Sequence, residues 1–333
     1  MNTVTSPSSA SADSFRRAWW LFELLSINSW GFYGLVLSIS ALALGGSRMM
    51  ALLFVCATYL VCWLPSHLTA RNEPQKGNVD SSGGTLWGIL AGLSGFFGAF
   101  CLVLSLSQGR GVVMLTMPLV FAAAPLVNVF YSLLLKRYPG GTWAIPNLFF
   151  GLGVGVIAFA AYWVLKKRPM PANLVTAVSN TAWFWYALGT ALFWGTYGPH
   201  NLKSMQKFGG SPARTLRCVC LTYGVCGAIA AIWFLDTAIV STKGIVFGLI
   251  AGLLGYGGAV GVAYANRAGM RMQPQRGPII NMPLIFGFAS VVSVFASILH
   301  SAPQNWGFLP SFLFALLLLI SGMVLILKNN PAH

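Results

Sequence analysis

Two short phrases place aromatic, glycine and polar residues where a membrane helix ordinarily carries aliphatic ones. "WGFYG" begins at Trp30 and "WGTYGPHN" begins at Trp194. On a helix, Trp30 and Tyr33 share one face, and Trp194, Tyr197 and Asn201 share another. Each face presents two aromatic rings with polar tips, which could enclose a small solute or stack on it. An interfacial aromatic belt would use the same residue types, so the functional interpretation rests on the phrase occurring twice.

His200 and Pro199 add a titratable ring and a helix-distorting residue to the second phrase. An imidazole can take up and release a proton near neutral pH, and an ionisable group inside a membrane is a candidate functional group. Proline removes a backbone hydrogen bond and tends to kink a helix. Alternatively, the helix ends near Pro199, which would leave His200 at the water boundary. His200 is therefore a candidate solute-binding residue and Pro199 a candidate hinge.

Two further prolines occupy matching positions, Pro118 in "MPLVF" and Pro283 in "MPLIF". Proline near a helix start is tolerated because its missing N–H has no helical partner there, so a structural role is one interpretation. A hinge or broken helix beside a transported solute is the other. The predicted solute-binding residues are Trp30, Tyr33, Asn128, Trp194, Tyr197, His200, Asn201, Tyr256, Tyr264 and Asn281, and the predicted hinges are Pro118, Pro199 and Pro283.

Catalysis and cofactor binding have no support in the residue pattern. Only five residues are acidic; Glu23 and Asp236 lie near the ends of apolar segments and the other three lie outside them. The usual Asp or Glu relay for protons or sodium therefore has no clear occupant in the membrane. No carboxylate pair suits acid–base catalysis, no cluster of His, Cys and acids suits a metal, and no phosphate-binding loop suits ATP. We predict that the protein is not an enzyme and has no catalytic residue, metal or cofactor.

The composition defines the setting in which these residues act. Of 333 residues, 56% are hydrophobic and 8% are charged, whereas about a quarter of the residues in a soluble domain are charged. The net charge of +15 comes from Lys and Arg placed between apolar runs, which is typical of a membrane topology signal rather than of a nucleic-acid surface. The predicted fold class is an all-α polytopic membrane protein. Its expected partners are the lipid bilayer and a small-molecule solute, with no nucleic acid.

Ten segments are long and apolar enough to span a bilayer, which takes about 20 residues. They cover residues 20–45, 49–69, 84–107, 111–136, 145–166, 181–203, 214–235, 243–266, 277–299 and 307–328. With the N-terminus inside, fourteen of the twenty Lys and Arg residues fall on the cytoplasmic side, as the positive-inside rule requires. We expect a multi-pass protein of the plasma membrane (the inner membrane in a Gram-negative cell) with both termini in the cytoplasm.

Three phrases recur in the same order at nearly constant spacing. Trp30 corresponds to Trp194 at an offset of 164 residues, "MPLVF" to "MPLIF" at 165, and "GILAGLSGFFGA" to "GLIAGLLGYGGA" at 160. The sequence therefore predicts two copies of a five-helix unit, and because five is odd the second copy is inverted in the membrane. Inverted repeats place a solute site near the midplane between them. The predicted domains are a disordered tail at 1–18, a first five-helix repeat at 19–168, a linker at 169–180, a second five-helix repeat at 181–328 and a C-terminal tail at 329–333.

These features together resemble the drug/metabolite transporter superfamily in its EamA-type ten-helix form. The resemblance rests on "SWGFYG" and "FWGTYG" in the first helix of each half, on the proline-bearing "TMPLVFAAAPLVNVFYSLLLKR" and on the glycine-rich "GLGVGVIAFAAYWVLKKR". The acid-bearing "GE" phrase usual after the fourth helix is replaced by "KRYPGG". The resemblance implies a secondary transporter or facilitator that moves a small polar or amphipathic metabolite by alternating access.

The alternatives concern the solute and the class of protein. A neutral, zwitterionic or anionic solute is expected, because the predicted cavity lacks an acid and Lys or Arg lie at its mouths. "WGTYGP" is also similar to sugar and ureide permease branches of the superfamily, so a sugar or nucleobase-like solute is one alternative. A membrane sensor or scaffold that transports nothing is another. A homodimer is compatible with the sequence, which leaves the solute, direction, coupling ion and oligomeric state open.

Overall fold

The computed structural model describes residues 9–73, 79–107, 113–136, 182–235, 241–272 and 277–300, and these residues are helical apart from short turns. The helices are α1 (Ser9–Ala43), α2 (Arg48–Asn72), α3 (Ser81–Leu106), α4 (Val113–Lys136), α7 (Ala182–Lys207), α8 (Pro212–Phe234), α9 (Thr242–Met272) and α10 (Gly277–His300). Apart from the start of α1, each coincides with a predicted span to within several residues at either end. The predicted spans at 145–166 and 307–328, the linker at 169–180 and the C-terminal tail lie outside the described residues.

Five of the described helices, α1, α2, α3, α8 and α9, are long and apolar enough to cross a membrane. The chain is therefore an all-α polytopic membrane protein, as the composition indicates. The helix α7 is not among the five; it carries the polar groups of the "WGTYGPHN" phrase, of which residues 197–201 are buried inside the protein. A central helix needs less hydrophobicity than one that faces lipid, since its neighbours supply hydrogen-bond partners.

The start of α1 differs from the prediction of a disordered tail at residues 1–18. The helix begins at Ser9, so the second half of that tail is helical. Alanine and straight-chain residues have high helix propensity, and the apolar span that follows provides a helix to extend. A low content of apolar residues was therefore an insufficient sign of disorder in this segment.

The turns after α1 and α7 are built alike. Gly45 and Gly46 end the first with φ of 64° and 93°, and Gly209 and Gly210 end the second with φ of 67° and 82°. Glycine adopts these left-handed conformations without the steric penalty of a Cβ atom. A serine N-cap then begins the next helix in each case: the Ser47 hydroxyl accepts from the backbone N–H of Met50, and that of Ser211 accepts from Arg214.

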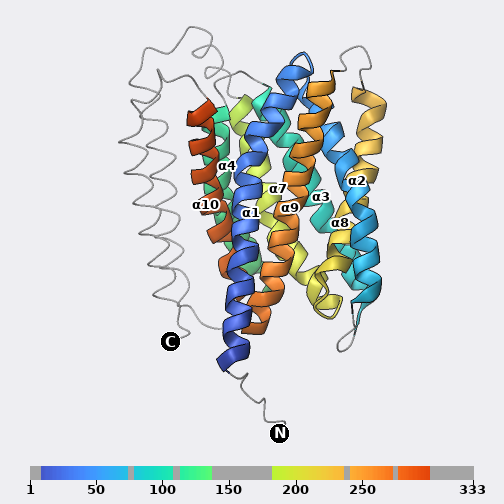
Figure 1. Ribbon diagram of the computed structural model, residues 1–333, viewed down its shortest axis with the longest axis vertical. Coiled ribbons are helices and arrows are strands. Elements are labelled where there is room, and N and C mark those ends of the chain that lie inside the picture. Colours follow the sequence, from blue (N-terminus) through green and yellow to red (C-terminus); the bar gives the residue numbers. More distant parts are fainter. Residues whose placement is uncertain are drawn as a thin grey trace.

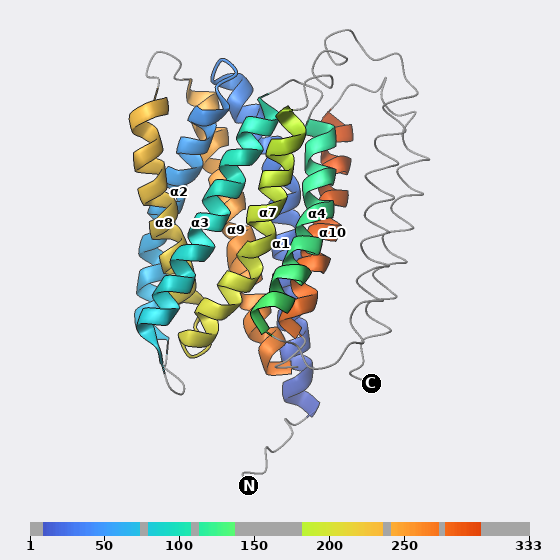
Figure 2. The same cartoon turned by 180° about the vertical axis from the view of Figure 1, so that it is seen from behind.

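The helices pack into two bundles, each of which combines helices from both halves of the sequence. The α1 bundle consists of α1, α2, α9 and α10, with α1 against α9 as its most extensive contact; the α7 bundle consists of α3, α4, α7 and α8, with α3 against α7. The bundles meet where α2 packs on α8 and where α4 packs on α10. Figure 1 and Figure 2 show that α1 starts at the lower end of the molecule and α7 at the upper end, so these two helices run in opposite directions.

Tight packing inside each bundle depends on glycine beside tryptophan. The indole N–H of Trp30 donates to the carbonyl of Gly255 at 3.2 Å, and that of Trp194 donates to the carbonyl of Gly95 at 3.3 Å. A Cβ atom at Gly258 or Gly98 would overlap the corresponding indole. Small residues permit helices to approach closely in membranes, where apolar burial between helices contributes little. The predicted glycine-rich segments therefore position the two tryptophans.

Candidate functional site: a central aromatic cavity

A small cavity lies between the two bundles at the centre of the molecule. Its volume is about 30 Å³, far below the roughly 300–1,000 Å³ of a typical ligand pocket. No charged side chain lines it among the residues that the structure describes. The lining residues are Trp30, Tyr33, Val55, Tyr59, Gly255, Ala259 and Phe286 from the α1 bundle, and Gly95, Trp194, Tyr197 and Tyr223 from the α7 bundle.

Aromatic rings from opposite bundles lie against one another around the cavity. Trp30 and Trp194 are nearly parallel, with ring centroids 6.5 Å apart. Tyr59 and Tyr223 stack at 4.0 Å. On the side where α4 meets α10, Phe121 is 5.7 Å from Phe286. These separations are typical of interacting aromatic pairs, so the rings themselves occupy the space in which a solute would have to bind.

Four of the predicted solute-binding residues line this cavity: Trp30, Tyr33, Trp194 and Tyr197. The two tryptophan N–H groups are bonded to backbone carbonyls in their own bundles. With these protein partners, the indoles are fixed in orientation and offer their faces and edges to the cavity.

Asn128 has a structural role that follows from Pro199. The helix α7 continues through Pro199 as far as Lys207, and proline has no N–H to donate to the carbonyl four residues earlier. That carbonyl belongs to Gly195, and it accepts a hydrogen bond at 3.2 Å from the side-chain amide of Asn128 on α4. Asn128 therefore satisfies the backbone group that Pro199 leaves without its helical partner, and it does not line the central cavity.

His200 is buried among three helices of the α7 bundle, with 7% of its surface exposed. Its Nδ1 is 2.9 Å from the Ser94 hydroxyl, and its Nε2 is 2.9 Å from the Tyr131 hydroxyl. The alternative that the helix ends near Pro199 and leaves His200 at the water boundary is wrong, because α7 extends beyond both residues. Both ring nitrogens have protein partners outside the cavity lining, so this histidine ties α3 and α4 to α7.

Two other predicted residues lie beside the cavity lining. The Asn201 amide is 3.5 Å from the Tyr197 hydroxyl, and the carbonyl oxygen of Asn201 is buried with no hydrogen-bond partner among the described residues. The Tyr256 hydroxyl is 2.8 Å from that of Ser66. The ring of Tyr256 meets Tyr59 edge to face, with centroids 6.0 Å apart. Both residues support rings that line the cavity.

The remaining predictions fall toward the lower end of the molecule, where α1 begins and α2 ends. Tyr264 stacks on Phe22 at 5.1 Å. The Asn281 carbonyl oxygen accepts from the Trp19 indole at 2.8 Å, and the Asn281 amide donates to the carbonyl oxygen of Asn266 at 2.8 Å. These residues form a polar cluster between α1, α9 and α10, apart from the cavity.

The three predicted hinge prolines all lie within helices. Pro199 lies inside a continuous helix. The backbone at Pro118 lies in α4 and that at Pro283 lies in α10, but the side chains of both are outside the described part of the structure. Their role as hinges stays a prediction.

Tyr59 and Tyr223 were missed although the sequence contains a signal for them. They occupy the same place in "CATYLVC" and "CLTYGVC", which are separated by the offset of 164 residues that relates Trp30 to Trp194. The three phrases that predict the repeat do not include these two. Aligning them would have placed the stacked tyrosine pair at a repeated position.

Glu23 also differs from its expected position near the end of a span. Its side chain is fully buried, and both carboxyl oxygens lack a hydrogen-bond partner among the described residues. It lies seven residues before Trp30, on the same face of α1. Asp236 lies outside the described residues. Within the described ranges, no group of three His, Cys, Asp or Glu side chains could hold a metal ion.

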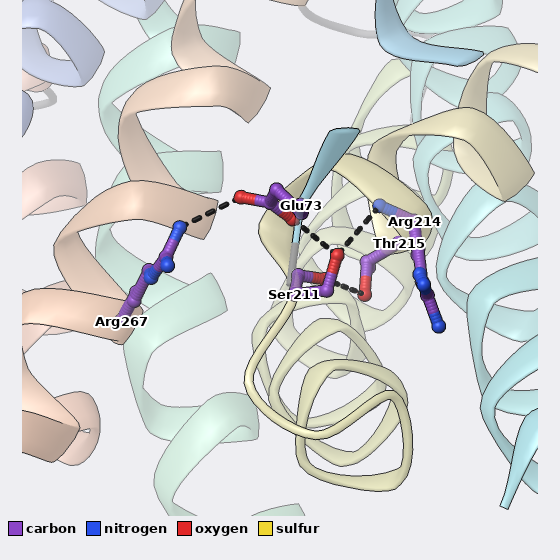
Figure 3. Close-up of polar contacts among 5 residues, drawn as sticks. All are labelled: Glu73, Ser211, Arg214, Thr215 and Arg267. Atoms are coloured by element: carbon purple, nitrogen blue, oxygen red, sulfur yellow. Dashed lines mark hydrogen bonds and ion pairs between the residues drawn. The ribbon is translucent and has the colours of Figure 1, made fainter. Parts of the chain in front are cut away.

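A polar contact joins the bundles at the lower end (Figure 3). Glu73, the C-cap of α2, pairs through Oε1 with Arg267 of α9 at 2.7 Å. Its Oε2 accepts a hydrogen bond from Ser211, the N-cap of α8 in the other bundle. We call the pair formed by Glu73 and Ser211 the lower latch. A polar pocket of about 170 Å³ adjoins it, lined by Glu73, Gly209, Gly210, Ser211, Arg267, Met270 and Arg271.

No family model and no curated protein matches this sequence. Among solved structures, a crystal structure described only as that of a protein is similar over 96% of this chain and 96% of its own. The TM-score is 0.57 and the sequence identity is 18%. This likeness shows a shared fold and transfers no activity. The chain is therefore similar in fold to a solved protein, and its function has to be argued from the cavity and the contacts around it.

Proposed function

We propose that this protein is a secondary transporter or facilitator that moves a small polar or amphipathic metabolite by alternating access. The observation that carries the proposal is the arrangement of two similar bundles around one aromatic cavity. Each bundle contributes a tryptophan and a tyrosine at repeated positions. A carrier needs a site that two moving bodies share, so that separating them at one end or the other exposes it to one side of the membrane.

We further propose ten helices in two inverted five-helix repeats, related to the drug/metabolite transporter superfamily of the EamA type. Contacts recur at the offsets found in the sequence, which supports this organisation. The Ser40 hydroxyl donates to the carbonyl of Gly244 at 2.7 Å, and the Ser204 hydroxyl donates to that of Gly84 at 2.8 Å. Opposite directions of α1 and α7 are what an inverted repeat requires. Each half can adopt the conformation of the other, which provides two states of similar energy, one open to each side of the membrane.

The cavity chemistry favours an uncharged or zwitterionic solute with a flat or apolar part. Indole and phenol rings bind such a surface by stacking, and tyrosine hydroxyls can bond its polar groups. No lining residue bears a charge to pair with a strong ion. Because the cavity of about 30 Å³ is far smaller than a typical ligand pocket, the solute enters only after the Tyr59 and Tyr223 pair or the Phe121 and Phe286 pair separates.

We assign the lower end to the cytoplasm of a plasma membrane, with the inner membrane as the site in a Gram-negative cell. Lys and Arg residues gather there among the described residues, for example Lys203, Lys207 and Arg214 at the junction of α7 and α8. The upper end has Arg48 and Lys243 at the starts of α2 and α9. Cytoplasmic loops carry an excess of Lys and Arg. On this assignment the lower latch is a cytoplasmic closure.

A thermal-shift screen of metabolites on the purified protein tests the proposal, because a ligand that binds the folded state raises its Tm. A metabolite that stabilises the wild type should give no shift with Trp30→Ala or Trp194→Ala, each compared with its own ligand-free Tm. Trp185→Ala is the matched control, since Trp185 also lies on α7 but is 66% exposed. Equal ligand shifts in all three variants would remove the cavity as the binding site.

A sensor or scaffold without transport has one observation in its favour. Such a protein needs no hollow, and the cavity holds only about 30 Å³. Reconstituted vesicles separate the two functions: a carrier exchanges a stabilising metabolite across the membrane, whereas a sensor binds it without exchange. Trp30→Ala should abolish the exchange of a carrier.

A further inference from the structure

Glu23 carries a carboxyl group inside the membrane-spanning part of α1. It has no role in the solute site proposed above. Its relative exposure is 0%. Glu23 and Trp30 are separated by two helical turns on one face of α1, or about 10 Å along the helix axis. The carboxyl group therefore lies between the cavity and the lower end of the molecule, on a stretch of α1 where Trp19 bonds Asn281 of α10 and Ser26 bonds Gly258 of α9.

The described residues around Glu23 offer no hydrogen bond to a negative charge. Neither oxygen has a hydrogen-bond partner among the described residues. A buried carboxylate without a cation or hydrogen-bond donor is strongly disfavoured, and such a group takes up a proton instead. The buried form is therefore the neutral carboxylic acid, and the proton is its bound cation.

The described charged groups of the neighbouring helices do not hydrogen-bond Glu23. The described titratable groups at this end of α1 and of the helices packed on it are Arg17, His67, Arg71, Tyr264, Arg267 and Arg271, and α10 has none among its described side chains. None of them hydrogen-bonds Glu23, and Arg267 pairs with Glu73. One turn below Glu23, the Trp19, Asn281 and Asn266 side chains bond one another. These amides use their polar atoms within that chain.

We propose that Glu23 is a proton-binding site and that it couples solute movement to protons; the coupling rests on the proposed function as a carrier. A proton from water joins the carboxylate and forms an O–H bond, and the neutral acid is buried while the two bundles are closed at the lower end. When the bundles separate there, water reaches this face of α1, the O–H bond breaks, the proton returns to water and the carboxylate is hydrated. The buried state thus requires the proton, because only the neutral form can be enclosed without a partner.

Infrared spectroscopy of the protein in lipid vesicles tests the proton site directly. At neutral pH the wild type should show a protonated-carboxyl C=O band that Glu23→Gln removes, while Glu73→Gln leaves it in place. Dicyclohexylcarbodiimide, which attacks protonated carboxyls in apolar surroundings, should label Glu23 and spare the ion-paired Glu73. Absence of the band in the wild type, or its persistence in Glu23→Gln, would overturn the assignment. Because glutamine preserves the shape and neutrality of the buried acid, this variant is expected to fold.

Vesicle transport tests the coupling separately. With a metabolite that stabilises the protein, Glu23→Gln should retain solute exchange but lose accumulation driven by a pH gradient. Undiminished accumulation by Glu23→Gln would refute coupling through this residue. A protein that binds no metabolite would refute the carrier and leave the infrared result standing. An ionised Glu23 would refute the proton site and leave solute binding standing.

Discussion

The lower latch provides a perturbation whose size follows from the structure. Ser211→Ala removes the hydroxyl that donates to Glu73 across the two bundles, and also the N-cap of α8. Losing an N-cap costs about 0.5–2 kcal/mol, and a hydrogen bond to a charged group is worth about 1.5–3 kcal/mol. Ser47→Ala is the matched control, because Ser47 caps α2 with the same 3.3 Å hydrogen bond. Among the described residues, Ser47 has no carboxylate partner.

The difference between the two variants isolates the contact between bundles. If the latch is worth about 1.5–3 kcal/mol in the closed state, its removal raises the ratio of open to closed molecules about 10- to 150-fold. Met270 lines the pocket beside the latch, so Met270→Cys provides a site to report opening. Its reaction rate with a water-soluble maleimide should rise strongly in the Ser211→Ala background and little in the Ser47→Ala background.

Equal labelling rates in the two backgrounds would refute the account of the latch. That result would mean that Ser211 acts as a helix cap alone. Tm values of both variants complete the comparison, because an N-cap contributes to the stability of each in the same way. A rise in labelling that simply followed the fall in Tm would reveal general unfolding rather than opening of one end.

Other perturbations test separate parts of the structure. Asn128→Ala should destabilise the protein by about 1–3 kcal/mol, because the Gly195 carbonyl loses its partner; Pro199→Ala restores a backbone donor and should reduce that loss in the double variant, measured by chemical denaturation. Gly98→Ala should displace the Trp194 indole, lower Tm through overpacking worth about 1–3 kcal/mol and abolish metabolite-induced shifts. Hydrogen bonds from the Gly83 backbone, Lys207 and Ser82 lower the pKa of Asp80 to about 2. The stabilisation from Asp80 is therefore present above its unfolded pKa of about 4 and lost as pH falls toward 2, so Asp80→Asn should flatten the fall of Tm in that window.

The sequence predicted the parts of the site that depend on residue type and repetition. Trp30 and Trp194 could be found because a rare phrase occurs twice, and both line the cavity. Tyr59 and Tyr223 carry the same repeat signal within less conspicuous phrases. Hydropathy alone could not distinguish these tyrosines from ordinary packing, since it reports what a segment buries and not which face meets the other bundle.

The residues that were placed differently depend on contacts between distant helices. Asn128 bonds Gly195 only because Pro199 lies four residues beyond that glycine and α4 packs beside α7. Glu23 lies close to the predicted start of a span, so its position along the chain suggested the membrane boundary. Its side chain is nevertheless fully buried, because helices distant in the sequence pack on α1, and a one-dimensional pattern does not contain this information.

The most direct test of the account is whether the two bundles move relative to each other when a solute binds. Leu68 on α2 and Leu221 on α8 are exposed residues of opposite bundles, so spin labels can be attached at Leu68→Cys and Leu221→Cys after the six native cysteines are replaced. Pulsed electron paramagnetic resonance should give two populations of distance, and a metabolite that stabilises the protein should change their ratio. A single distance that is identical with and without that metabolite would contradict alternating access.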